Sequence, residues 1–144
     1  MTAISDALED DKIAVSEKLS LNTRVRMFLE QVARRQVPIT YQELAKGLQI
    51  SPPNTIHQLT VALESLMEED AAVGRPLIAA LVISKARGGL PASGFFDCAR
   101  RLAQYSGAEE GPEAWAFHAS AFNAAVTFWG AGAEAADGQG QIES

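Results

Sequence analysis

The chain has 144 residues, of which 47% are hydrophobic, and this suits one globular domain with appendages and excludes a fully disordered chain. One cysteine, Cys98, excludes an internal disulfide and a multi-cysteine metal site within a single chain. No apolar run approaches the roughly 20 residues that a bilayer span needs, and the first residues lack a signal-peptide pattern. We therefore expect a cytoplasmic protein with no membrane partner and no cofactor.

The net charge of −6 is unevenly distributed along the chain. Residues 1–18 carry five acids and two bases, residues 19–105 carry ten bases and seven acids, and residues 106–144 carry six acids and no base. A mildly basic middle between acidic ends suits a polyanion such as DNA, although a balance of +3 is weak for that purpose.

The organisation of the chain follows from these shifts in composition. We expect a partly disordered N-terminal arm over residues 1–20, a winged helix-turn-helix domain over 21–105, a C-terminal helix over 111–130 and a disordered acidic tail over 131–144. The expected fold class is mainly α with a small β wing.

A first helix is predicted to begin at Asn22 or Thr23, either of which can cap it, and to end before Pro38. Its buried stripe follows the spacing i, i+3, i+4 and i+7 and consists of Val25, Phe28, Leu29 and Val32.

A second, short helix begins at a capping box formed by Thr40 and Glu43. Two prolines in Ser51–Thr55 require a turn, and a third helix is predicted from about Thr55 to Asp70. Short helix, turn and longer helix is the helix-turn-helix order. The buried stripe of the third helix is predicted to be Ile56, Leu59, Leu63, Leu66 and Met67.

A strand is predicted over Leu77–Ile83, and the glycine-rich loop Lys85–Pro91 lies where a wing should follow. A fourth helix is marked by the apolar positions Phe95, Cys98, Ala99 and Leu102. Because no general base is placed beside Cys98, we interpret it as a buried structural thiol.

The stretch Ile39–Ala45, which reads I-T-Y-Q-E-L-A, resembles the opening of the DNA-binding half of O6-alkylguanine-DNA alkyltransferases, and the later elements follow in a similar order over roughly residues 22–104. The resemblance implies a winged helix-turn-helix in which Tyr41 contacts a phosphate. It does not carry the activity, because Val82–Lys85 stands where that family has Pro-Cys-His-Arg. The arginine that this family inserts into DNA aligns near His57.

In a helix-turn-helix the early, outward residues of the second helix touch base edges. Here these residues are Thr55, His57, Gln58 and Val61. Phosphate contacts are expected from Tyr41 and from the bases Arg24, Arg26, Lys85 and Arg87. Against DNA binding, the stretch from Gln49 to Gly74 contains no lysine or arginine.

These features predict a non-enzymatic protein that binds double-stranded DNA, as a small bacterial transcriptional regulator would. The alternative is an adaptor whose winged helix binds another protein. The sequence shows no catalytic dyad, phosphate-binding loop or metal cluster that would indicate an enzyme.

The last helix is predicted from Pro112 to about Trp129 and is apolar nearly all round. Two apolar stripes on opposite sides suggest that one covers the domain and the other a second chain, which predicts a homodimer. The residues assigned to dimerisation are Trp115, Phe117, Phe122, Phe128 and Trp129. In the alternative, a single domain wraps both sides of this helix.

Overall fold

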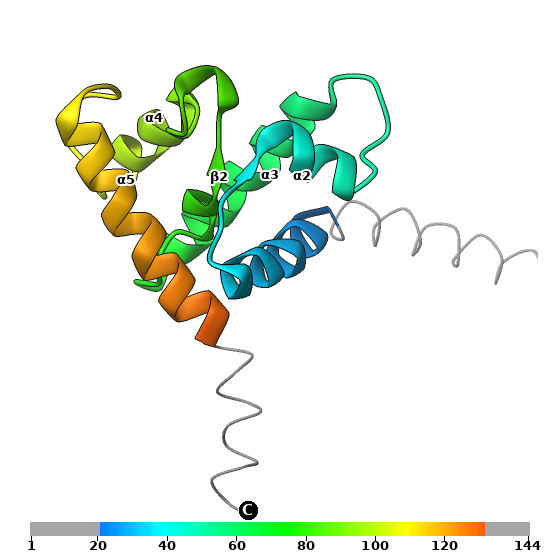
Figure 1. Ribbon diagram of the computed structural model, residues 1–144, viewed down its shortest axis with the longest axis horizontal. Helices are drawn as coiled ribbons and strands as arrows, with labels where there is room; N and C mark the ends of the chain where they lie inside the picture. The colour runs from blue at the N-terminus through cyan, green and yellow to red at the C-terminus, as the bar shows by residue number, and fades with distance from the viewer. Residues whose placement is uncertain (1–20, 132–144) are drawn as a thin grey trace, which may run out of the picture.

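The computed structural model describes residues 21–131 and is mainly helical with one small parallel sheet (Figure 1). A first helix over residues 21–35 is followed by four further α-helices: α2 (Tyr41–Gly47), α3 (Thr55–Ala72), α4 (Ser93–Arg101) and α5 (Pro112–Ala125). The expected arm over 1–20 and almost all of the expected tail lie outside the described residues.

The first helix buries the predicted stripe. Val25, Leu29 and Val32 are buried and Phe28 is half-buried, so this prediction is confirmed. The predicted cap is wrong, because residues 21–23 are already helical. The Asn22 side-chain amide instead donates to the Ser65 hydroxyl at 3.1 Å and so joins this helix to α3.

The sheet joins two segments that are far apart in sequence. Strand β1 (Ile39–Thr40) pairs in parallel with β2 (Val82–Ile83), with Ile39 opposite Val82. The strand predicted over Leu77–Ile83 is therefore correct only for its last two residues. The preceding η1 (Ile78–Leu81) is a buried 3₁₀ turn, in which the amide of Ile78 donates to the Asp70 carboxylate instead of to a neighbouring strand.

The α2–turn–α3 unit follows its local sequence signals. The Thr40 hydroxyl accepts from the Glu43 amide at 3.1 Å, and the Glu43 carboxylate accepts from the Thr40 amide at 3.0 Å, which confirms the capping box. Helix α3 begins at Thr55 as predicted and buries four of the five predicted stripe residues, namely Leu59, Leu63, Leu66 and Met67. Ile56 is 39% exposed, because it lies on the first turn of α3, ahead of the part that meets the core.

The glycine-rich loop after β2 is compact. It contains the short 3₁₀ helix η2 (Lys85–Arg87) and is closed by a hydrogen bond from the Ser84 amide to the Leu90 carbonyl at 2.7 Å. Because the two strands of residues 21–131 pair with each other in parallel, this loop does not join the arms of a β-hairpin.

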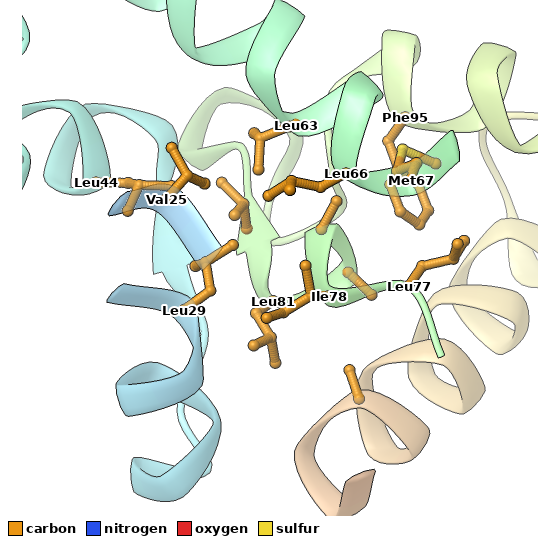
Figure 2. Close-up of a cluster of buried hydrophobic side chains, with 14 of the residues drawn as sticks. Val25, Leu29, Leu44, Leu63, Leu66, Met67, Leu77, Ile78, Leu81 and Phe95 are labelled. Atoms are coloured by element: carbon orange, nitrogen blue, oxygen red, sulfur yellow. The ribbon is translucent and has the colours of Figure 1, made fainter. Parts of the chain in front are cut away.

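The core lies between the first helix, α3 and η1, and is closed by α4 and α5. Figure 2 shows Leu29, Leu66 and Ile78 pointing toward a common centre. Helix α4 buries Cys98, and burial raises the pKa of this thiol, so the predicted buried thiol is confirmed. Helix α5 begins at Pro112 as predicted and continues into the π-helical turn η3 (Val126–Gly130).

Candidate interaction surface

The turn between α2 and α3 is held by side chains that reach into it. The Gln58 side-chain amide donates to the carbonyl oxygens of Ser51 and Pro53, each at 2.9 Å. The Arg24 guanidinium donates to the carbonyl of Leu48, the C-cap of α2. The start of α3 is thereby fixed relative to α2 and to the first helix.

The first two turns of α3 present an uncharged surface. Val61 is 54% exposed, His57 and Ile56 are also exposed, and Thr55 is half-buried. We call these four residues the α3 face. None of the four is a lysine or arginine, and the sequence from Gln49 to Gly74 contains neither.

Two of the predicted DNA contacts have their polar groups engaged inside the molecule. Tyr41 is buried, and its hydroxyl accepts a hydrogen bond from the Ala92 amide at 3.0 Å. Burial also raises the pKa of this phenol. In this conformation the Tyr41 side chain supports the core, and its contact with a phosphate stays a prediction. Gln58 is likewise held by the turn carbonyls and does not point freely toward a base edge.

The predicted phosphate-binding arginines are also engaged within the chain. Arg26 forms ion pairs with Glu69 at 3.2 Å and with the buried Asp70 at 3.0 Å. Arg87 donates to the carbonyls of Pro91 and Glu109. The sequence had predicted that these side chains contact phosphates. In the structure they join segments of the fold instead.

The ten lysines and arginines of residues 21–131 fall into two groups. Six form hydrogen bonds or ion pairs with their own chain: Arg24, Arg26, Arg75, Arg87, Arg100 and Arg101. Four are exposed and form no hydrogen bond or ion pair within this part of the chain: Arg34, Arg35, Lys46 and Lys85. Of the nine predicted DNA contacts, Thr55, His57, Val61 and Lys85 are therefore at least partly exposed and form no side-chain hydrogen bond or ion pair within residues 21–131.

A buried charge network lies under the end of α5, and the sequence interpretation missed it. The Asp70 carboxylate, fully buried, lies 3.0 Å from the guanidinium groups of both Arg26 and Arg75. Both arginines also stack over the Trp129 ring, at 4.8 and 5.2 Å from its centre. Asp70 continues the apolar spacing of α3 after Leu66, so its burial was readable from periodicity.

The side of α5 that packs against the domain lies between the two predicted apolar stripes, one of which contains Trp115 and Phe122 and the other Phe117 and Phe128. Its buried residues, including Ala114, His118 and Ala125, lie between those stripes. The His118 ring nitrogen Nε2 bonds to the Ala80 carbonyl at 2.8 Å, and burial lowers the pKa of this imidazole.

Three of the residues predicted to mediate dimerisation pack inside the molecule. Trp129 is buried and donates to the Pro76 carbonyl at 3.0 Å. Phe117 stacks on Tyr105 at 4.3 Å, and Phe122 is half-buried beside His118. Trp129 therefore has little surface left for a second chain, whereas a dimer contact by the half-buried Phe117 and Phe122 stays a prediction. Trp115 and Phe128 are 46% and 44% exposed.

A small, mostly apolar hollow of about 70 Å³ lies between α3 and the start of α4, and of the α3 residues that line it Thr60 is the one next to Val61 in sequence. Thr60, Leu63, Glu64 and Met67 of α3 form one wall, and Ala92 and Phe95 at the start of α4 contribute to the other. Thr60 uses its hydroxyl within α3, where it donates to the Ile56 carbonyl at 2.9 Å. The hollow therefore suits an apolar group more than a polar one.

Within residues 21–131, no group of three or more His, Cys, Asp or Glu side chains is placed to hold a metal ion. No helix in the same span is long and apolar enough to cross a membrane. Comparison of the chain with protein-family models, with curated proteins and with solved structures gave no match.

Proposed function

We propose that this protein is a non-enzymatic interaction module that binds another protein through the α3 face. The observation that carries the proposal is the character of that face: Ile56 and Val61 are exposed, and no cation lies among them. The helix that a helix-turn-helix would place in DNA therefore offers apolar groups and one imidazole.

The positions of the lysines and arginines also favour a protein partner over DNA. Lysine and arginine supply most of the sequence-independent affinity for DNA by displacing counterions from phosphates. Arg24, Arg26 and Arg87 cannot do so without giving up their contacts within the fold. An arginine that is paired within the molecule is not available to a phosphate. The number of lysines and arginines in the domain therefore exceeds the number that could contact a DNA duplex.

The chemistry around the α3 face indicates the kind of partner. The neighbouring hollow of about 70 Å³ has room for one apolar side chain, and buried apolar anchors in pockets dominate the energetics of protein interfaces. Lys46 on α2 is exposed and unpaired, as is Lys85, whose charge acts on the α2 residue Glu43. We infer a polypeptide segment that combines an apolar anchor with carboxylates.

The helix-turn-helix interpretation belongs to the same proposal. It is supported by the order of α2, turn and α3, by the capping box and by the strand and glycine-rich loop that follow. The loop Lys85–Pro91 would stand in the position of a wing.

A selection from a random peptide library displayed on phage, with the full chain as bait, tests the proposal. We expect enriched peptides to share an apolar residue near Asp or Glu. Their binding should weaken at least tenfold with Val61→Asp and be unchanged with Val73→Asp, a matched substitution of a valine that is 65% exposed at the other end of α3. Failure to enrich any peptide, or equal binding by the two variants, would contradict the proposal.

Sequence-specific DNA binding, as in a small transcriptional regulator, is the second candidate. Its specific support is that Thr55, His57, Val61 and Lys85 stay accessible, with Lys46 nearby on α2. A gel shift with random duplex DNA over a range of salt concentrations separates the two. A shift at low salt that weakens evenly across sequences in Lys46→Ala and Lys85→Ala would favour DNA over the protein partner.

A further inference from the structure

Beyond the first turn of α5, which has the exposed Glu113, the outward side of α5 and η3 has no charged side chain. We call it the outer face; it extends from Trp115 to Phe128 and has Ala119, Ser120, Asn123 and Ala124 at its centre, all of them exposed. The sequence from Ala114 to Ala131 contains no Asp, Glu, Lys or Arg, and its one titratable side chain, His118, is buried on the opposite side.

This composition differs from that of an ordinary solvated helix. A soluble surface is usually about 25–35% charged, whereas the centre of a protein interface is depleted of charge and enriched in aromatic residues. Here two large aromatic side chains, Trp115 and Phe128, are nearly half exposed at the two ends of the face. Small side chains occupy the stretch between them.

We propose that the outer face of α5 binds the same face of a second copy of this chain. A two-fold pair places a surface against itself, so any charge on it would oppose a like charge, and the outer face avoids this cost by having none. The small residues Ala119, Ser120 and Ala124 allow two helices to approach to about 8 Å, the close end of helix packing distances.

The surface area that the outer face can bury limits the size of the dimer interface. Aromatic side chains bury roughly 150–250 Å² when fully covered, so the half-exposed Trp115 and Phe128 of two copies supply about 300–500 Å². The small residues of both helices must supply the rest of the roughly 1,000 Å² that a specific interface requires. The dimer therefore lies at the lower end of interface size and dissociates on dilution.

The pairing leaves the other surface free. Figure 1 shows α5 at the left edge of the molecule and the turn between α2 and α3 at the right edge. A dimer through α5 thus carries two α3 faces, each on the side away from the contact. The proposal does not depend on what the α3 face binds.

Sedimentation velocity of the full chain from low to high micromolar concentration tests the proposal. We expect a reversible monomer–dimer equilibrium whose dissociation constant rises at least tenfold with Asn123→Arg, or with Ala119→Lys as a second variant. Gln31→Arg, the same kind of change at an exposed position of the first helix, should leave it unchanged. A monomer at all concentrations, a dimer that tolerates both outer-face variants, or one that Val61→Asp disrupts instead, would overturn the proposal.

Discussion

Arg26 of the first helix and Asp70 of α3 meet at 3.0 Å in the interior, where the Arg26 guanidinium also covers the Trp129 ring at 4.8 Å. The same carboxylate lies 3.0 Å from Arg75 and accepts the Ile78 amide at 3.1 Å. One buried carboxylate thus joins the first helix, α3 and η1, and Arg26 and Arg75, which pair with it, cover Trp129 of η3.

Replacing Asp70 should destabilise the protein strongly. In Asp70→Ala, two mostly covered guanidinium groups lose their counter-charge and the Ile78 amide loses its acceptor. Removing one member of a buried ion pair costs about 3–5 kcal/mol. Urea unfolding followed by circular dichroism measures this change in the free energy of unfolding.

The neighbouring Glu69 provides the control for that measurement. Its side chain is 52% exposed and, among residues 21–131, pairs only with Arg26, at 3.2 Å, so Glu69→Ala should cost about 1 kcal/mol or less. Equal losses in the two variants would mean that the buried network does not hold the helices together.

The buried His118 predicts a loss of stability in mild acid. Burial lowers the pKa of this imidazole in the folded protein, whereas in the unfolded chain it titrates near its usual pKa of about 6.5. Below that pH the unfolded chain binds a proton that the folded protein excludes, so the free energy of unfolding falls as the pH decreases from about 6.5 toward the lower folded pKa.

Urea midpoints between pH 7.5 and pH 5.5 measure this effect. In His118→Gln, which keeps a donor for the Ala80 carbonyl, the slope over that interval should be smaller than in the unchanged protein. Replacing the exposed His57 by Gln should leave the slope as it was. If both substitutions flatten it equally, burial of His118 is not the cause.

Gln58→Ala should loosen the turn without unfolding the domain. The substitution removes both hydrogen bonds to the carbonyls of Ser51 and Pro53, each worth about 1 kcal/mol. Hydrogen exchange measured by mass spectrometry should show faster exchange at residues 49–60 and little change in α4. His57→Ala, one residue away and exposed, is the control; a Gln58→Ala protein with unchanged exchange would rule out this role.

Signals confined to one stretch of chain predicted local structure well. The capping box of Thr40 and Glu43, the proline turn and the stripe from Val25 to Val32 all depend on spacings within a few residues. The start of α5 at Pro112 belongs to the same class, because a proline on the first turn needs no partner elsewhere.

The errors arose where a residue's role depends on distant contacts. Nothing near Arg87 in the sequence indicates that the Glu109 carbonyl would accept its hydrogen bond. Tyr41 looked like a surface residue because its partner, the Ala92 amide, comes from another element. In α5, apolar residues surround the helix, so periodicity alone could not show that the side around His118 faces the core.

The parallel pairing of Ile39 with Val82 has a consequence for variation in this molecule. The chain leaves the sheet at Thr40, forms α2 and α3, and returns beside its point of departure at Val82. Because the entry and exit of this excursion are adjacent, the turn at its far end can change in length or sequence without moving α4 and α5. The sequence at this end of the molecule can therefore vary while the remainder keeps its architecture.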